Sequence, residues 1–160
     1  MSEVQTKSLI AQILDTWIQG EKSEKLTLAN YANAAAILNE NVDDINWVGF
    51  YLYDQQLNQL VLGPFLGKPA VTVISPDSGV VGQSFTAQST VVVPDVKAFS
   101  GHIVCDPISN AEIVVPITKA DGTKLGVLDI DSPTLNRFTK QDQTDLEDYI
   151  QTLLGYIDRI

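Results

Sequence analysis

Residues 46–53 read NWVGFYLY, and this stretch begins the sheet on which the rest of the chain is organised. Its aromatic and β-branched residues favour an extended backbone. Residues 59–65, QLVLGPF, have the same character and follow the short polar segment DQQLN at 54–58. Two such runs joined by a short polar loop are typical of a β-hairpin. The sequence therefore predicts two adjacent antiparallel strands here.

A second hairpin is predicted from Glu112–Thr118 and Lys124–Ile130. The Asp121-Gly122 pair between them is a strong turn signal. Shorter strands are predicted at Val71–Ile74 and Thr90–Val93. Residues 75–110 are rich in Pro, Gly and Ser, with 12 of the 27 such residues, so we expect a long irregular stretch there, where binding loops are commonly found.

Helical periodicity flanks the strands. One apolar stripe at helical spacing is formed by Ile10, Ile13, Leu14, Trp17 and Ile18. We expect Gly20 to end this helix and a second, Ala-rich helix to begin after Ser23 or Thr27. A last helix is predicted from Thr139, with Asp142 as its capping-box partner. Its expected buried stripe is Leu146, Ile150, Leu153 and Ile157.

This order of elements predicts an α+β fold with one mostly antiparallel sheet. The length of 160 residues suits a single domain, 1–160.

Ten Lys and Arg against twenty Asp and Glu leave a net charge of −10. Such a chain repels nucleic acid and anionic membrane surfaces. No apolar run is long enough to span a bilayer, and no signal peptide is evident. A single cysteine fits a reducing compartment, so we expect a cytoplasmic protein.

That cysteine, Cys105, lies in the polar segment GHIVCDPISN. A free cysteine is often a small buried hydrophobic residue, but in a loop it can also be a nucleophile. Backbone N–H groups and the only histidine, His102, favour the thiolate form. The neighbouring Asp106 is expected to raise the pKa of the thiol. With one His and one Cys, a structural zinc site is not expected.

Three carboxylates accompany this thiol. Asp129 and Asp131 share one face of a predicted strand, about 7 Å apart. They either form a solvated face or bind a cation, which is a metal or a ligand ammonium group. Glu112 is either a surface charge or, in a desolvated site, a proton donor to a leaving oxygen. On the strand 46–53, Trp47 and Tyr51 flank Gly49 on one face, which suggests a small apolar gap between two rings.

Six segments occur together in an order that resembles one known family. They are NWVGFYLY, LVLGPFLGKPA, SGVVGQSF, VPDV, GHIVCDPISNAEIVVPI and LGVLDIDSP with RFT. The sequence is similar to the free methionine-(R)-sulfoxide reductases, which are small stand-alone GAF-domain enzymes. The resemblance implies a sheet of about six strands with the N- and C-terminal helices packed on one side. It also implies reduction of free L-methionine-(R)-sulfoxide, with no cofactor and no metal.

By this resemblance, Cys105 stands at the position of the nucleophile. Glu112, Asp129 and Asp131 resemble the carboxylates that hold the substrate amino group, and Glu112 and Asp131 also serve catalysis by helping to protonate the sulfoxide oxygen. Trp47 and Tyr51 resemble the walls around the S-methyl group.

The sequence departs from the family at two positions. Members commonly carry resolving cysteines where Val81 and Val91 stand here. A single-cysteine enzyme then needs an external reductant, either thioredoxin or a low-molecular-weight thiol. The alternative is a GAF module that binds methionine sulfoxide or a related small molecule without turnover. The family also suggests a homodimer.

Overall fold

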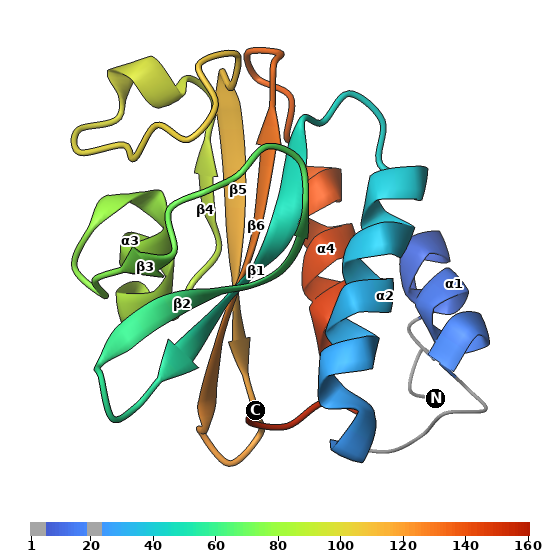
Figure 1. Ribbon diagram of the computed structural model, residues 1–160. Coiled ribbons are helices and arrows are strands. Elements are labelled where there is room, and N and C mark those ends of the chain that lie inside the picture. The colour runs from blue at the N-terminus through green and yellow to red at the C-terminus, as the bar shows by residue number, and fades with distance from the viewer. Residues whose placement is uncertain (1–5, 19–23) are drawn as a thin grey trace.

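The computed structural model describes residues 6–18 and 24–160. Its centre is a six-stranded antiparallel sheet with the strand order β3-β2-β1-β6-β5-β4 (Figure 1). The strands are β1 (Trp47–Asp54), β2 (Gln59–Leu66), β3 (Val73–Ile74), β4 (Val91–Val93), β5 (Ala111–Thr118) and β6 (Lys124–Ser132). Both predicted hairpins are present, and the predicted α+β class with one antiparallel sheet is confirmed.

The register of the three central strands brings distant residues together. Trp47 of β1 pairs with Asp131 of β6, and Glu112 of β5 pairs with the same Asp131 from the other side. Tyr51 lies opposite Val127, which is two residues before Asp129. Since residues directly opposite in an antiparallel pair share a face, the predicted aromatic and acidic faces are one and the same surface.

Three helices lie on the other side of the sheet. They are α1 (Leu9–Ile18), α2 (Thr27–Asn41) and α4 (Lys140–Leu153), all on the same side in Figure 1. The face of the sheet is covered by α2 and α4, and α1 packs on these two helices. The capping box at Thr139 and Asp142 is present as predicted, and the predicted stripe of α4 is buried, including Ile157 beyond its end. Trp17 departs from the prediction, because it is 63% exposed on the outer side of α1.

The site-bearing face is covered by a helix that the sequence analysis missed. Residues 79–87, predicted to be irregular, form α3 (Gly79–Ala87). Glycine and valine have low helix propensity, so packing stabilises this short helix. Val80, Val81 and Phe85 are buried in the apolar cluster on this side of the sheet. Residues 99–110 do form a loop without regular helix or strand, as expected.

The remaining boundaries differ little from the predictions. A single 3₁₀ turn, Glu24–Leu26, leads directly into α2 at Thr27. The predicted helix stop at Gly20 and the alternative start at Ser23 lie outside the described residues. Within the described ranges, no helix is long and apolar enough to cross a membrane.

Candidate active site

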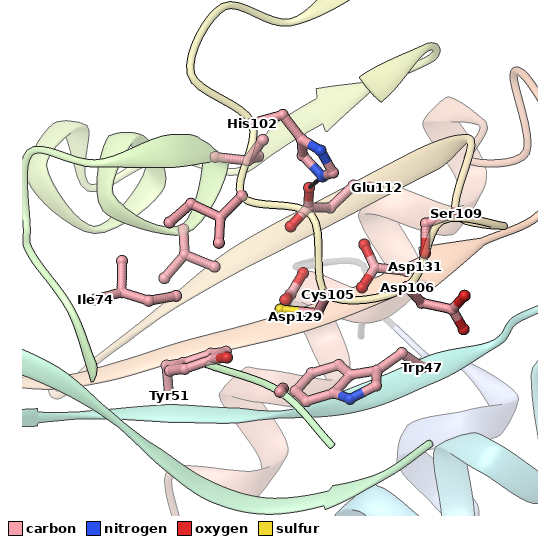
Figure 2. A pocket seen from close by; sticks show the side chains of 14 residues that line it. Trp47, Tyr51, Ile74, His102, Cys105, Asp106, Ser109, Glu112, Asp129 and Asp131 are labelled. Atoms are coloured by element: carbon pink, nitrogen blue, oxygen red, sulfur yellow. Dashed lines mark ion pairs between the residues drawn. The ribbon is translucent and has the colours of Figure 1, made fainter. Parts of the chain in front are cut away.

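A pocket opens on the sheet face opposite α1, α2 and α4. Its floor is formed by β1, β5 and β6, and its walls by α3 and the 99–110 loop (Figure 2). The predicted residues Trp47, Tyr51, Cys105, Glu112, Asp129 and Asp131 all line it. The central cavity measures about 30 Å³, which is space for roughly two water molecules. The register and the loop thus gather every site residue that the sequence analysis named.

The three carboxylates form a compact cluster. Glu112 is 4% exposed and Asp129 is 6% exposed, while Asp131 is partly buried. One oxygen of each lies within 4.8 Å of the others. The alternatives of a solvated strand face and a surface charge are therefore wrong for Asp129 and Glu112. The cluster offers hard oxygen ligands of the kind that a metal ion or an ammonium group binds.

Burial and the proximity of the three carboxyl groups favour their neutral, protonated form. Burial, reinforced by the charge of Asp131, raises the pKa of Glu112 to about 8, although a hydrogen bond with Asp129 works in the opposite direction. Burial also raises the pKa values of Asp129 and Asp131 well above the ordinary range, and their acidic neighbours add to the shift. Among the described residues, Oδ1 of Asp129 has no hydrogen-bond partner. The cluster can therefore hold a proton or receive a cation.

The sulfur of Cys105 lies at the edge of this cluster (Figure 2). Burial raises the pKa of the thiol, a backbone hydrogen bond from Val71 lowers it, and the charges of Asp129, Asp131 and Glu112 raise it again. Together these effects raise the pKa of Cys105 and favour the thiol form. A cation bound to the carboxylates would offset their negative charge, and the lower thiol pKa would favour the thiolate.

Asp106 does not act on the thiol as the sequence analysis expected. Its carboxylate accepts hydrogen bonds from the backbone N–H of Ile108, at 3.1 Å, and from Asn46 Nδ2, at 3.2 Å. Lys68 Nζ lies 3.5 Å away. The Ile108 hydrogen bond is the main reason why the pKa of Asp106 is lowered. Asp106 therefore fixes the segment that follows Cys105, and the carboxylates of the cluster raise the thiol pKa instead.

His102 contacts the cluster rather than the thiol. Its Nε2 lies 3.2 Å from Oε2 of Glu112, as the dashed line in Figure 2 marks. Burial lowers the pKa of His102, so the neutral imidazole is favoured near pH 7. The sequence analysis did not find this pair, because no periodicity relates a loop histidine to a strand residue ten positions later.

The two aromatic residues form one wall. Trp47 and Tyr51 are stacked with ring centroids 6.0 Å apart. Trp47 Nε1 donates to the carbonyl of Lys68 at 3.1 Å, and the Tyr51 hydroxyl donates to the carbonyl of Val71 at 2.8 Å. The rings therefore hold the segment between β2 and β3, whose Val71 backbone reaches Cys105.

The predicted gap at Gly49 is wrong. A Cβ on Gly49 would lie 2.3 Å from Cβ of Phe65 and 2.8 Å from Cη2 of Trp47. Phe65 also stacks on Trp47 with centroids 5.3 Å apart. The glycine is thus required for a close approach between β1 and β2, and the space beside it is already filled.

The two valines at the expected cysteine positions lie in different surroundings. Val81 of α3 is buried and lines the pocket that contains Cys105. Val91 of β4 is half-buried and is not among the residues that line this pocket.

Comparison with known proteins places this architecture in a family. No family model matches the chain. A free methionine-R-sulfoxide reductase of Escherichia coli is 44% identical over 126 residues, which cover 79% of this chain and 74% of the relative. The structure of fRMsr of Staphylococcus aureus in complex with its substrate superposes with a TM-score of 0.84 at 43% identity, covering 94% of both chains. A solved GAF domain gives a TM-score of 0.84 at 34% identity, covering 93% of this chain and 85% of that one. The fold is therefore that of a GAF domain, and the chain belongs to the free methionine-R-sulfoxide reductases, a family of oxidoreductases.

Proposed function

We propose that this protein reduces free L-methionine-(R)-sulfoxide to methionine with Cys105 as the sole nucleophile. One observation supports this most directly: the only sulfur able to react lies in the same pocket as three crowded carboxylates and a stacked aromatic pair. A zwitterionic amino acid with an oxidised sulfur presents an ammonium group, a polar oxygen and a methyl group. The pocket offers a matching group for each.

Glu112, Asp129 and Asp131 bind the ammonium group in this proposal. Asp129 and Glu112 are buried, and Oδ1 of Asp129 has no hydrogen-bond partner among the described residues, so a cation is stabilised there by charge-assisted hydrogen bonds. Trp47 and Tyr51 pack against the S-methyl end. The 30 Å³ cavity is smaller than the amino acid, so the pocket must widen when the substrate binds.

The reaction transfers an oxygen and two electrons. The Cys105 thiolate attacks the sulfoxide sulfur, and the sulfoxide oxygen takes up a proton. The oxygen ends on Cys105 as a sulfenic acid, while methionine leaves as the thioether. Glu112 is the proton donor, because burial raises its pKa to about 8 before the substrate binds, so it enters the reaction protonated at neutral pH. Asp131 supports this step by raising the pKa of Glu112.

The sulfenic acid must then be reduced from outside the chain. Cys105 is the only cysteine, so no disulfide can form within the chain. We propose a thiol reductant, either thioredoxin or a low-molecular-weight thiol. That residues 1–160 form one domain, and that the protein forms a homodimer, also remain predictions.

A single-turnover experiment tests the proposed function. Fully reduced protein is mixed with excess free L-methionine-(R)-sulfoxide and no reductant, and the methionine released is counted. We expect one methionine per chain from the wild type and none from Cys105→Ser. Binding of the substrate to Cys105→Ser, measured by calorimetry, should stay within about threefold of the wild type, because no charged contact is lost. Absence of methionine with a reduced thiol would contradict the proposal.

A further inference from the structure

We propose that the thiol that regenerates Cys105 is a small aminothiol without net negative charge, held by the same carboxylates that receive the ammonium group of the substrate. This inference rests on the proposed function, since it concerns the second half of that reaction. It adds the chemical class of the second substrate, which the reductase activity alone leaves open.

The pocket selects by charge. Glu112, Asp129 and Asp131 lie close to the sulfur, and the charge of each of them raises the pKa of Cys105. In the described structure, two basic side chains lie near the cluster. Lys68 is largely exposed and contacts Asp106. His102 contacts Glu112, but burial lowers the pKa of His102 and favours its neutral form. An anionic thiol therefore approaches a sulfenic acid that lies beside three acids, whereas an ammonium group meets Oδ1 of Asp129, which has no hydrogen-bond partner among the described residues.

The pocket also selects by length. In methionine sulfoxide, three carbon atoms separate the nitrogen from the sulfur. In the proposed complex the ammonium group lies at the carboxylates and the sulfur lies beside Cys105. When methionine leaves, the carboxylates and the space beside Cys105 become accessible at the same time. A thiol with two or three carbons between nitrogen and sulfur spans the same two points, so its sulfur is placed next to the sulfenic sulfur.

The chemistry balances with two thiols. The first thiol attacks the sulfur of the Cys105 sulfenic acid, the S–S bond forms and the S–O bond breaks. The oxygen leaves as water with the proton that the attacking thiol gives up. A second thiol of the same class cleaves the mixed disulfide, which returns Cys105 as a thiol and releases the symmetrical disulfide. The two thiols supply the two electrons that methionine sulfoxide consumed.

The experiment compares three thiols of equal spacing and different charge. The sulfenic form is first made by one turnover with no reductant, and the methionine count verifies that it formed. The sulfenic acid is then reacted with 2-aminoethanethiol, 2-mercaptoethanol or 2-mercaptoethanesulfonate, and return of the free thiol is followed by quenched labelling. Each rate constant is normalised to the thiolate concentration, because the three thiols differ in pKa.

We expect the cationic thiol to react at least tenfold faster than the neutral one, and the neutral one at least tenfold faster than the anionic one. In Asp131→Asn the ratio between the cationic and anionic thiols should fall by at least tenfold. Glu40→Gln removes an exposed charge from α2, on the far side of the sheet, and should leave the ratio unchanged.

Two results would overturn the inference: equal normalised rates for the three wild-type reactions, or faster reduction by thioredoxin than by the aminothiol at equal thiol concentration. Both can be measured on the wild type, so they do not depend on the folding of a variant. If no methionine is released in the first step, the proposed function fails and the inference fails with it. Normal methionine release followed by charge-independent reduction refutes the inference alone.

Discussion

Replacing Glu112 by Gln should stabilise the protein, and more so as the pH rises. In the folded chain, burial reinforced by the charge of Asp131 raises the pKa of the Glu112 carboxyl from 4.5 to about 8. In the unfolded chain the Glu112 carboxyl has its ordinary pKa of 4.5 and releases its proton near that pH. Between the two values, therefore, the unfolded state has lost a proton that the folded state retains, and stability falls as the pH rises. Gln has nearly the same shape and does not titrate.

The two pKa values set the size of the effect. With 4.5 in the unfolded chain and about 8 in the folded one, the Glu112 carboxyl costs about 1.4 kcal/mol at pH 5.5 and about 4.4 kcal/mol at pH 8. The advantage of Glu112→Gln should thus grow by about 3 kcal/mol between these conditions. Any constant effect of the amide on packing cancels in this difference.

Urea unfolding of both proteins at the two pH values measures this difference. Glu40→Gln removes an exposed carboxylate from α2 and serves as the control for net charge. Its effect should differ by less than about 0.5 kcal/mol between the two pH values. The reasoning is refuted if the effect of Glu112→Gln is independent of pH, or if this variant becomes relatively less stable at pH 8.

Two further predictions concern binding and packing. Asp131→Asn should weaken binding of free L-methionine-(R)-sulfoxide roughly ten- to hundredfold in calorimetry, because it removes one charged partner of the ammonium group; unchanged affinity would exclude that role. Gly49→Ala should cost about 3 kcal/mol in urea unfolding, because its Cβ would lie 2.3 Å from Phe65 Cβ. Gly155→Ala, whose Cβ has no contact shorter than 3.4 Å, is the matched control, and equal losses in the two variants would contradict the packing argument.

The sheet and the faces of its strands could be predicted because they follow from local periodicity. Alternation alone placed Asp129 and Asp131 with Val127, and Trp47 with Tyr51, and the structure agrees. The alternation of side chains along a strand does not show which strands are neighbours in the sheet. The pairing of β1 with β6 is a long-range contact, and it is this pairing that turns two separate patterns into one surface.

The misses arise where the structure depends on contacts that local sequence patterns do not describe. The segment that forms α3 contains glycines and valines, so its helix depends on contacts with the sheet. Gly49 suggested an open gap, but Phe65 from the neighbouring strand fills it. Trp17 fits the helical stripe by spacing, yet lies at its exposed margin. The contact between His102 and Glu112 depends on the path of a loop, which no sequence pattern describes.

The crowding of Glu112, Asp129 and Asp131 gives the site a property that none of them has alone. Burial and the negative charge that these acids share both raise the pKa of Cys105, so the nucleophile is kept as a thiol. The ammonium group of a bound substrate neutralises the cluster, and the same field then no longer opposes the thiolate. Reactivity of Cys105 thus follows occupancy of the pocket. An amine without a sulfoxide should also lower the thiol pKa, which ties activation to charge rather than to the reaction itself.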